Sequence, residues 1–268
     1  MLLVIDCGNT NTVFAVYADD GDGDALGVWR SSTKGKRTAD EYAVWLNQLM
    51  VLAGMEMRQI SQVIVATVVP SAIFALRSLC RNHLGCEPMV VGEANVSLGA
   101  EVRIDRPEEV GADRVVNAVA AHAQYGGPLI VVDFGTATTF DVVEADGAYA
   151  GGAIAPGINL SLEALYMAAA QLPRIVIKPP EEEPGRNEPV KVIGKNTRSA
   201  MHSGIFWGYV AMIEGMIARI KAEYGEPMKV IATGGLAKLF TSWTDALEIA
   251  DDDLTLKGLR MIHRRNKG

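Results

Sequence analysis

The feature that most constrains the fold is an internal repeat. The segment from Val4 to Val16 returns 127 residues later as the segment from Val131 to Val143, with five of thirteen aligned positions identical. Each copy is an apolar run that ends at an aspartate and continues through a turn rich in Gly, Asn and Thr. Because this offset is close to half of the 268 residues, the repeat predicts two similar domains, residues 1–126 and 127–268.

The pattern after each copy supports the duplication. Further strands, separated by Asp/Gly turns, are predicted at 12–17 and 26–30 in the first half and at 138–144 and 149–154 in the second. This succession is typical of antiparallel meanders. Helices are expected over 38–52, 111–125, 156–172 and 196–223, and buried strands over 62–69 and 229–233. The first helix opens with the capping-box pattern Thr38-x-x-Glu41.

Composition and charge exclude several classes of protein. A net charge of −7 argues against non-specific nucleic-acid binding, which requires neutralisation of phosphates. No apolar stretch approaches the roughly 20 residues of a membrane span, and no signal peptide precedes Asp6. The odd cysteine count fits a reducing compartment, so we expect a cytoplasmic protein with no nucleic-acid or membrane partner.

Two clusters have ordinary explanations. Cys80, His83 and Cys86 are three residues apart, but a structural zinc site needs four ligands and no second pair of Cys or His occurs, so ordinary half-buried residues are favoured. The basic tail, with Arg260, Arg264, Arg265 and Lys267, could bind an anion. Cations also favour a helix C-terminus, which is the better interpretation.

The two repeated turns are candidate phosphate loops. In Asp6–Thr12 and Asp133–Thr139, glycine permits close approach of a ligand, and backbone N–H groups can cradle phosphate. An aspartate at a strand end can hold hydrated Mg²⁺. A single such turn could be an ordinary hairpin, but two related copies favour binding. Thr233-Gly234-Gly235 could lie against adenine or ribose, or could be only a strand-to-helix turn.

The motif Gly111-Ala112-Asp113-Arg114 opens a predicted helix. A carboxylate in a first turn is usually a cap that the helix dipole favours. In a functional interpretation, Asp113 accepts a hydroxyl proton and Arg114 binds an anion. The dipole is expected to keep Asp113 ionised and make it a weak base, which phosphoryl transfer tolerates.

These motifs together resemble those of type III pantothenate kinases over nearly the whole chain. The resemblance lies in Asp6–Thr12, Gly111–Arg114, Asp133–Thr139, Gly151–Gly157, Asn196-Thr197 and Thr233–Gly235, in that order. This family belongs to the superfamily of actin and the sugar kinases. The resemblance therefore implies an α/β fold of duplicated ribonuclease-H-like domains, with mixed five-stranded sheets and flanking helices.

The resemblance also implies an activity, the ATP-dependent phosphorylation of pantothenate to 4′-phosphopantothenate, which is the first step of coenzyme A synthesis. It implies Asp113 as catalytic base, Asp6 near Mg²⁺, and Asp133 as the ligand of K⁺ or NH₄⁺. By residue match the first phosphate loop comprises Asp6, Cys7, Gly8, Asn9, Thr10, Asn11, Thr12 and Val13, and the second includes Thr136. The implied pantothenate contacts are Gly111, Ala112, Asp113, Arg114 and Thr197.

Members of the family are dimers in which the partner closes the pantothenate pocket, so a homodimer is implied. The helix over 196–223 is apolar over more than one face, which fits either a dimer interface or burial within one domain; its apolar residues include Ile205, Phe206, Trp207, Tyr209, Val210 and Met212.

Three features depart from the family pattern. The stretch Ile104–Pro107 lacks the aromatic residue that many members place ahead of the Gly-x-Asp-Arg motif, and Cys7 replaces a more usual aliphatic residue. The Glu-rich loop Glu181–Glu188 has no assigned role. Alternative functions are an accessory transcription regulator of the same family or a superfamily kinase with another acceptor; intact Asp6, Asp113 and Asp133 favour the kinase.

Overall fold

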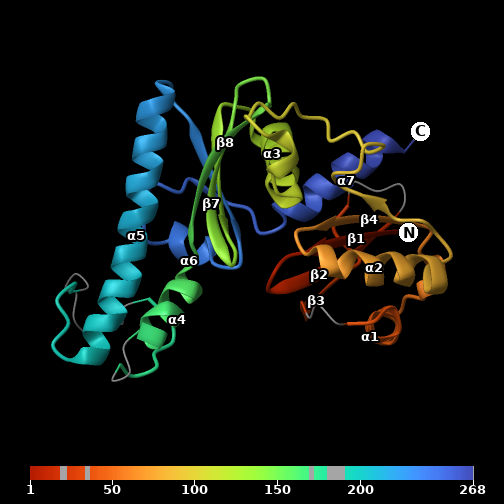
Figure 1. The fold of residues 1–268 in the computed structure, drawn as a ribbon, viewed down its shortest axis with the longest axis horizontal. Helices are drawn as coiled ribbons and strands as arrows, with labels where there is room; N and C mark the ends of the chain where they lie inside the picture. The colour runs from red at the N-terminus through yellow and green to blue at the C-terminus, as the bar shows by residue number, and fades with distance from the viewer. Residues whose placement is uncertain (19–22, 34–36, 169–171, 180–190, 268) are drawn as a thin grey trace. The chain divides into compact units, whose positions relative to one another are not determined.

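The chain folds into two compact units. The structure, a computed structural model, describes residues 1–18, 23–33, 37–168, 172–179 and 191–267 (Figure 1). The first unit comprises Met1–Gly126, Gly147–Tyr149 and Asp253–Gly268, and the second comprises Gly127–Asp146 and Ala150–Asp252. The Glu181–Glu188 loop and most of the acidic turn after Ala18 lie outside the described residues.

The first unit is built on a mixed five-stranded sheet of order β3-β2-β1-β4-β5. Strand β1 pairs antiparallel with β2 and parallel with β4. The strands are β1 (Leu2–Cys7), β2 (Asn11–Tyr17), β3 (Gly27–Ser32), β4 (Gln62–Thr67) and β5 (Met89–Val90). The longer helices are α1 (Ala39–Leu52), α2 (Pro70–Leu79), α3 (Ala112–Tyr125) and α7 (Leu254–Asn266), with single turns at Met57–Gln59, Cys80–Leu84 and Pro107–Glu109.

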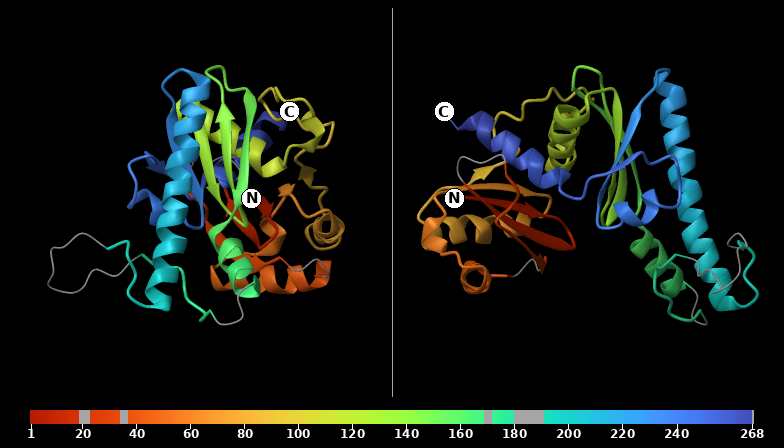
Figure 2. Two further views of the ribbon diagram at one scale, coloured as in Figure 1. Left: turned by 60° about the vertical axis from the view of Figure 1, so that its left-hand side comes forward. Right: turned by 180° about the vertical axis from the view of Figure 1, so that it is seen from behind.

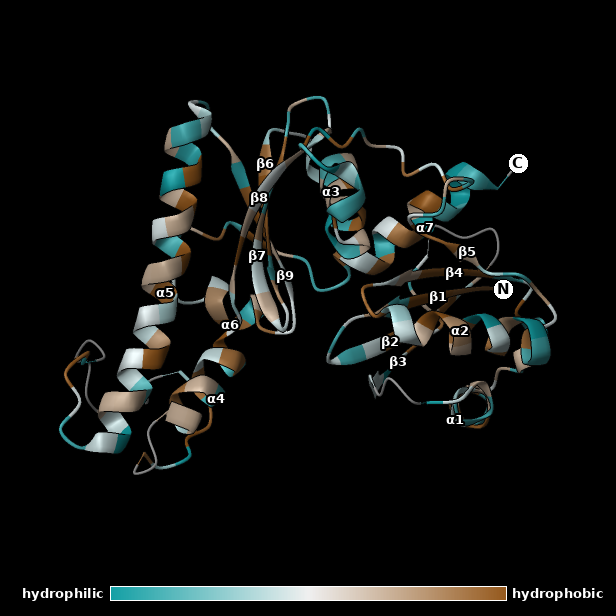
Figure 3. Cartoon of the chain, viewed as in Figure 1, coloured by the Kyte–Doolittle hydropathy of each residue, from teal (hydrophilic) through white to brown (hydrophobic). Residues whose placement is uncertain are grey.

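Both faces of this sheet are covered, because side chains alternate along each strand. On β1, Leu3 and Ile5 pack in the cluster that contains Leu46 of α1 and Leu76 of α2. Leu2 and Val4 point the other way, into the cluster formed with α3 and α7. Figure 3 shows β1 and β4 as predominantly hydrophobic strands. Two-sided burial explains why their sequences read as continuous apolar runs.

The second unit repeats this architecture. Its sheet has the order β8-β7-β6-β9-β10, which matches β3-β2-β1-β4-β5 strand for strand. The strands are β6 (Leu129–Phe134), β7 (Ala137–Val143), β8 (Tyr149–Pro156), β9 (Lys229–Gly234) and β10 (Ile249–Ala250), and the helices are α4 (Ile158–Ala168), α5 (Thr197–Tyr224) and α6 (Ala237–Thr241). Helices α5 and α6 pack on one face of the sheet, where Phe206 and Phe240 meet Ile130 and Val132 (Figure 2).

The predicted duplication is confirmed, with one correction to its alignment. Asp6 pairs with Val13 across the first hairpin, whereas Asp133 pairs with Thr139 across the second. The second turn is therefore one residue shorter. Thr12 pairs with Cys7, and its structural counterpart is Thr138, which pairs with Phe134, rather than Thr139 as the ungapped repeat suggests.

The last helix belongs spatially to the first unit. Leu256, Leu259 and Ile262 of α7 are buried in the same cluster as Leu2 and Val4. Compactness thus groups Asp253–Gly268 with the first unit, whereas the division predicted from the sequence assigned these residues to the second domain. The boundary at residues 126 and 127 stays a prediction.

Most predicted helices begin close to the residues that predicted their N-termini. Thr38 caps α1 in a capping box with Glu41, and Asn196 caps α5 by accepting from the Ser199 N–H. Helix α4 begins at Ile158 rather than Pro156, because β8 continues to Pro156. Strands β5 and β10 were not predicted, and helices α2 and α6 were expected without bounds. None of the described helices combines the length and apolar character needed to cross a bilayer.

Candidate active site

The first candidate loop connects β1 to β2 and is anchored at both ends. Cys7 and Thr12 are fully buried, while Asn9, Thr10 and Asn11 are exposed at its tip. The Gly8 N–H donates to the Asn11 carbonyl at 3.0 Å and closes the turn. Gly8 has no positive φ, so the turn itself does not require glycine. A Cβ added at Gly8 would lie 3.4 Å from the Asn11 carbonyl oxygen.

The loop is also held from β3. The Thr33 hydroxyl donates to the Gly8 carbonyl at 2.7 Å, and the Thr33 N–H donates to the Thr10 carbonyl at 2.8 Å. The Thr12 and Thr33 hydroxyl oxygens lie 2.9 Å apart. Sequence reasoning missed Thr33, because nothing in its own neighbourhood indicates a contact with residues 25 positions away.

The second candidate loop connects β6 to β7. The Gly135 N–H donates to the Ala137 carbonyl at 3.0 Å, and the Gly157 N–H, after β8, donates to the Thr136 carbonyl at 3.1 Å. The fully buried Thr138 hydroxyl contacts the Tyr209 hydroxyl of α5. Like the first loop, it is a short turn with buried anchors.

The structure brings the motif Thr233-Gly234-Gly235 beside Asp133. Strand β9 runs parallel to β6, with Thr233 opposite Asp133 and Gly234 opposite Phe134. Gly234 has φ +87°, and a Cβ there would lie 2.5 Å from Asp133 Oδ1 and 2.7 Å from the Phe134 carbonyl oxygen. Both the backbone conformation and the neighbouring carboxylate therefore require glycine at this position.

Asp113 lies in the first turn of α3, as predicted. Its Oδ1 accepts from the Arg114 N–H at 2.8 Å. Burial raises the pKa of Asp113 above its ordinary value, although the Arg114 N–H and guanidinium oppose the shift. The prediction that the helix dipole makes this carboxylate a weak base is therefore wrong in direction, because desolvation outweighs the stabilising partners.

The geometry explains why glycine precedes this aspartate. Gly111 is the N-cap of α3, and a Cβ on it would lie 2.6 Å from Asp113 Oδ1 and 3.7 Å from the Val68 side chain. The Val68 N–H in turn donates to the Cys7 carbonyl at 3.1 Å. Val68 thus links the start of α3 to the end of β1, where the first loop begins.

The remaining predicted residues occupy different surroundings. Arg114 is partly buried and lies over the Tyr149 ring, 5.5 Å from the ring centroid. Thr197 is exposed in the first turn of α5. Within the first unit the structure therefore joins the first loop to the Gly111–Arg114 motif, and within the second unit it joins Asp133 to Gly234.

The Cys80, His83 and Cys86 cluster and the basic tail have ordinary structural surroundings. The described residues contain no group of three or more His, Cys, Asp or Glu side chains that could hold a metal ion. His83 Nε2 lies 2.8 Å from Asp40 Oδ1, and burial raises the pKa of the Cys80 thiol to about 12, which disfavours a thiolate ligand. The last turn of α7 carries His263, Arg264 and Arg265, as a helix C-terminus favours.

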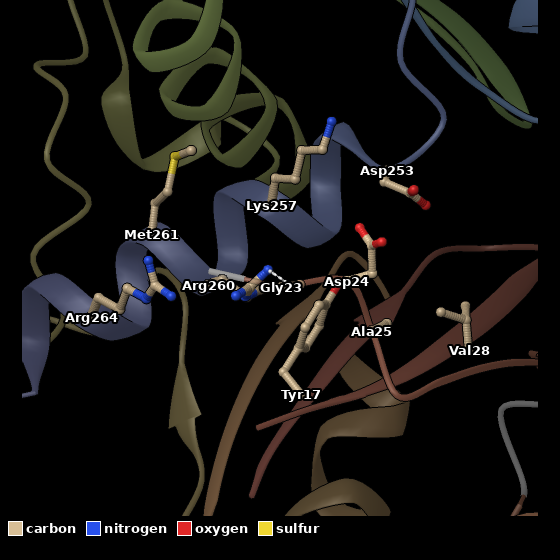
Figure 4. Close-up of a pocket in the computed structure, with 10 residues that line it drawn as sticks. All are labelled: Tyr17, Gly23, Asp24, Ala25, Val28, Asp253, Lys257, Arg260, Met261 and Arg264. Carbon is tan, nitrogen blue, oxygen red and sulfur yellow. Dashed lines mark hydrogen bonds between the residues drawn. The ribbon is translucent and has the colours of Figure 1, made fainter. Parts of the chain in front are cut away.

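A hollow of about 400 Å³ lies between α7 and the β2–β3 connection (Figure 4). The Arg260 guanidinium lies 4.1 Å from the Tyr17 ring centroid and donates to the Gly23 carbonyl at 2.9 Å. Cations of α7 share the lining with Asp24 and Asp253. This mixed charge, without any predicted site residue, does not indicate an anion site.

Comparisons with known proteins identify close relatives. A profile of the family described as Type III pantothenate kinase matches residues 2–219. A protein of that name from Paramagnetospirillum magneticum is 61% identical over 267 residues, which cover 99% of this chain and 98% of the relative. One from Rhodospirillum rubrum is 61% identical over 268 residues, which cover 100% of this chain and 99% of the relative.

Solved structures resemble the chain at much lower identity. A Campylobacter jejuni protein assigned to a Baf family of transcriptional activators has a TM-score of 0.59 at 19% identity, with 98% of both chains covered. A Sinorhizobium meliloti protein assigned as a 2-dehydro-3-deoxygalactonokinase has a TM-score of 0.55 at 12% identity, covering 99% of this chain and 96% of its own. At these identities the likeness shows the fold alone.

Proposed function

The chain belongs to the type III pantothenate kinase family, and from that premise we propose how its residues phosphorylate pantothenate. The reaction transfers the γ-phosphoryl group of ATP to the primary hydroxyl of pantothenate and gives 4′-phosphopantothenate, the first step of coenzyme A synthesis. The observation that carries this function is 61% identity over the full length of relatives with that name. The fold is the duplicated α/β fold of the actin and sugar-kinase superfamily.

We assign the two turns to the phosphates of ATP. The first loop exposes Asn9, Thr10 and Asn11 at its tip, where a phosphate can reach backbone N–H groups. In the second loop, Thr136 is the residue that we assign to phosphate binding. Phosphoryl transfer has a loose transition state, so positioning and charge stabilisation supply most of the catalysis.

Asp113 is proposed as the catalytic base. A carboxylate whose pKa is raised by burial accepts the hydroxyl proton more readily than a solvated aspartate does. Its bond from the Arg114 N–H fixes one carboxylate oxygen and leaves the other for the acceptor hydroxyl. Arg114, Gly111, Ala112 and Thr197 are the proposed pantothenate contacts, with Arg114 as the partner of the pantothenate carboxylate.

The acidic residues of the two loops fit the cations that the family implies. Asp6 is a partly buried carboxylate at the carboxyl end of β1, which suits Mg²⁺ shared with phosphates. Asp133 lies beside the Phe134 carbonyl at Gly234, and such oxygen donors suit a hard cation such as K⁺ or NH₄⁺. When bound, the two cations would reduce negative charge around the phosphates.

We further propose a homodimer in which Thr197 completes the partner's pantothenate pocket. The apolar residues that suggested an interface from the sequence, such as Phe206 and Trp207, pack against the core of the second unit instead. Support comes from the outer face of α5, where Gly204, Gly208 and Ala211 are exposed. Added Cβ atoms at Gly204 and Gly208 would meet nothing within 4 Å, so this chain does not itself require glycine there.

The function is tested by a coupled assay of ADP release, with and without pantothenate, in the presence of Mg²⁺ and K⁺. We expect ADP release that depends on pantothenate and a product whose mass is that of phosphopantothenate. Pantothenate-independent turnover, or turnover with another acceptor only, would instead favour a different kinase of the superfamily. The cytoplasmic location stays a prediction.

A further inference from the structure

The residue that follows the third strand makes the same contact in both halves of the molecule. Thr33 follows β3 and Gly157 follows β8. Each donates its backbone N–H to a carbonyl of its own half's candidate loop, Thr33 to Thr10 at 2.8 Å and Gly157 to Thr136 at 3.1 Å. Because the two halves share little sequence at these positions, the repeated contact points to a requirement of the loop rather than of one side chain.

Gly157 makes this contact at a position where a side chain does not fit. A Cβ at this position would overlap the Thr136 carbonyl oxygen and would lie 2.8 Å from the Gly135 carbonyl oxygen. The second loop therefore rests directly on the backbone of residue 157.

Unlike Gly157, Thr33 also holds its loop through a side chain. Its hydroxyl donates to the Gly8 carbonyl at 2.7 Å, in addition to the backbone bond to Thr10. The exposed Asn9 lies between these two fixed carbonyls. In a trans peptide the C=O and N–H point in opposite directions, so fixing the Gly8 carbonyl toward Thr33 turns the Asn9 N–H away from it. That N–H is thereby directed away from the Thr33 hydroxyl.

This contact belongs to a connected set of side-chain contacts. The Gly8 carbonyl can only accept, so the Thr33 hydroxyl proton goes to Gly8. The Thr33 oxygen lies 2.9 Å from Thr12 Oγ1, which in turn lies 3.3 Å from Cys7 Sγ. The buried Cys7 and Thr12 thus hold the hydroxyl of Thr33 in place beside the loop.

We propose that Thr33 is a positioning residue for ATP. Its hydroxyl fixes the Gly8–Asn9 peptide, so that the Asn9 N–H of the first loop is presented to a nucleotide phosphate. This inference rests on the proposed function, which gives the loop a phosphate to bind. Thr33 touches no substrate itself and acts through the loop.

The test compares Thr33→Val, which removes the hydroxyl at nearly constant volume, with Thr33→Ser, which keeps it. We expect Thr33→Val to raise the KM for ATP and the Kd for ADP by about tenfold, as for the loss of one neutral hydrogen bond. The KM for pantothenate should stay within about twofold, since the change acts on the nucleotide loop, and Thr33→Ser should restore most of the nucleotide affinity.

Thr241→Val is the matched control. The Thr241 hydroxyl also donates to a backbone carbonyl, that of Ala237, at 2.8 Å, and it belongs to α6 and to neither loop. Thr241→Val should lower the melting temperature without changing ADP affinity. Equal ADP affinities for wild type and Thr33→Val, measured by calorimetry, would overturn the proposal. Because ADP binding needs no pantothenate, this outcome is distinct from failure of the proposed reaction.

Discussion

Asp113, the proposed catalytic base, lies at a helix terminus where a carboxylate is usually a cap. Its carboxylate lies where a side chain on Gly111 would be, and its Oδ1 accepts from the Arg114 N–H. Burial then raises the pKa of Asp113 despite the neighbouring Arg114. A side chain that served only as a cap would gain from remaining ionised. The raised pKa is what a base for a hydroxyl proton requires.

Asp113→Asn keeps the size of the side chain and removes the proton acceptor. We expect kcat to fall by about 10²- to 10⁴-fold, while ATP binding changes little. In the wild type, activity should fall on the acid side at a pH above the ordinary aspartate pKa of 3.8, because the base must be ionised. A variant with nearly wild-type turnover in steady-state kinetics would leave Asp113 as a cap alone.

Although Asp113→Asn should lower kcat, it should raise the stability of the folded protein. Because the folded-state pKa of Asp113 is raised, its contribution to stability is present below the unfolded pKa and is lost as pH rises through the folded pKa. At about pH 7, Asp113→Asn should therefore unfold at higher urea concentration than wild type, and this gap should narrow as the pH falls toward the ordinary aspartate pKa of 3.8. A gap that stayed constant with pH would show that charge burial is not its cause.

At the scale of elements, the end of β6 and the turn after β9 lie side by side and depend on each other. Gly234 has a positive φ, and a Cβ added to it would lie 2.5 Å from Asp133 Oδ1. The carboxylate therefore depends on the neighbouring turn for its place.

We expect activity to rise with K⁺ or NH₄⁺ and to be poor in Na⁺ alone. Asp133→Ala should abolish that dependence along with most activity, because it removes the proposed carboxylate ligand. Gly234→Ala should weaken the K⁺ response as well, since its Cβ displaces Asp133. Rates are compared in matched chloride buffers at constant ionic strength. Equal rates in Na⁺ and K⁺ would contradict the assignment of Asp133.

What the sequence predicted at this scale was local. The capping box at Thr38 and the strand-turn-strand of each half depend on residues a few positions apart. The role of Thr33 could not be predicted, because it depends on the register of β2 against β3. The pKa of Asp113 was missed for a similar reason, since burial by distant residues outweighs the local dipole.

At the scale of the whole molecule, the composite site predicts complementation between two inactive subunits. A heterodimer of Asp113→Asn and an inactive Thr197 variant contains one site with both residues intact. After subunit exchange at equal concentrations, random pairing should restore about one quarter of wild-type activity. Sedimentation at micromolar concentration establishes the dimer. A fully active monomer, or no recovery in heterodimers shown to have formed, would rule out a composite site.

The arrangement of the two units was only partly predictable. The repeat anticipates two equal halves, and the matching strand orders agree with it. No local pattern, however, indicates that the helix after β10 covers Leu2 and Val4, because that contact joins the two ends of the chain.

This closing contact has a consequence for biosynthesis. During translation, β1 and β4 emerge early, yet one face of their sheet is only partly covered, by α3, until Leu256, Leu259 and Ile262 leave the ribosome. Each of these side chains contributes about 1.5–3 kcal/mol when buried, a large share of a typical domain's 5–15 kcal/mol. The portion synthesised first is thus completed last, and the nascent chain exposes an apolar surface that chaperones recognise until its final helix is released.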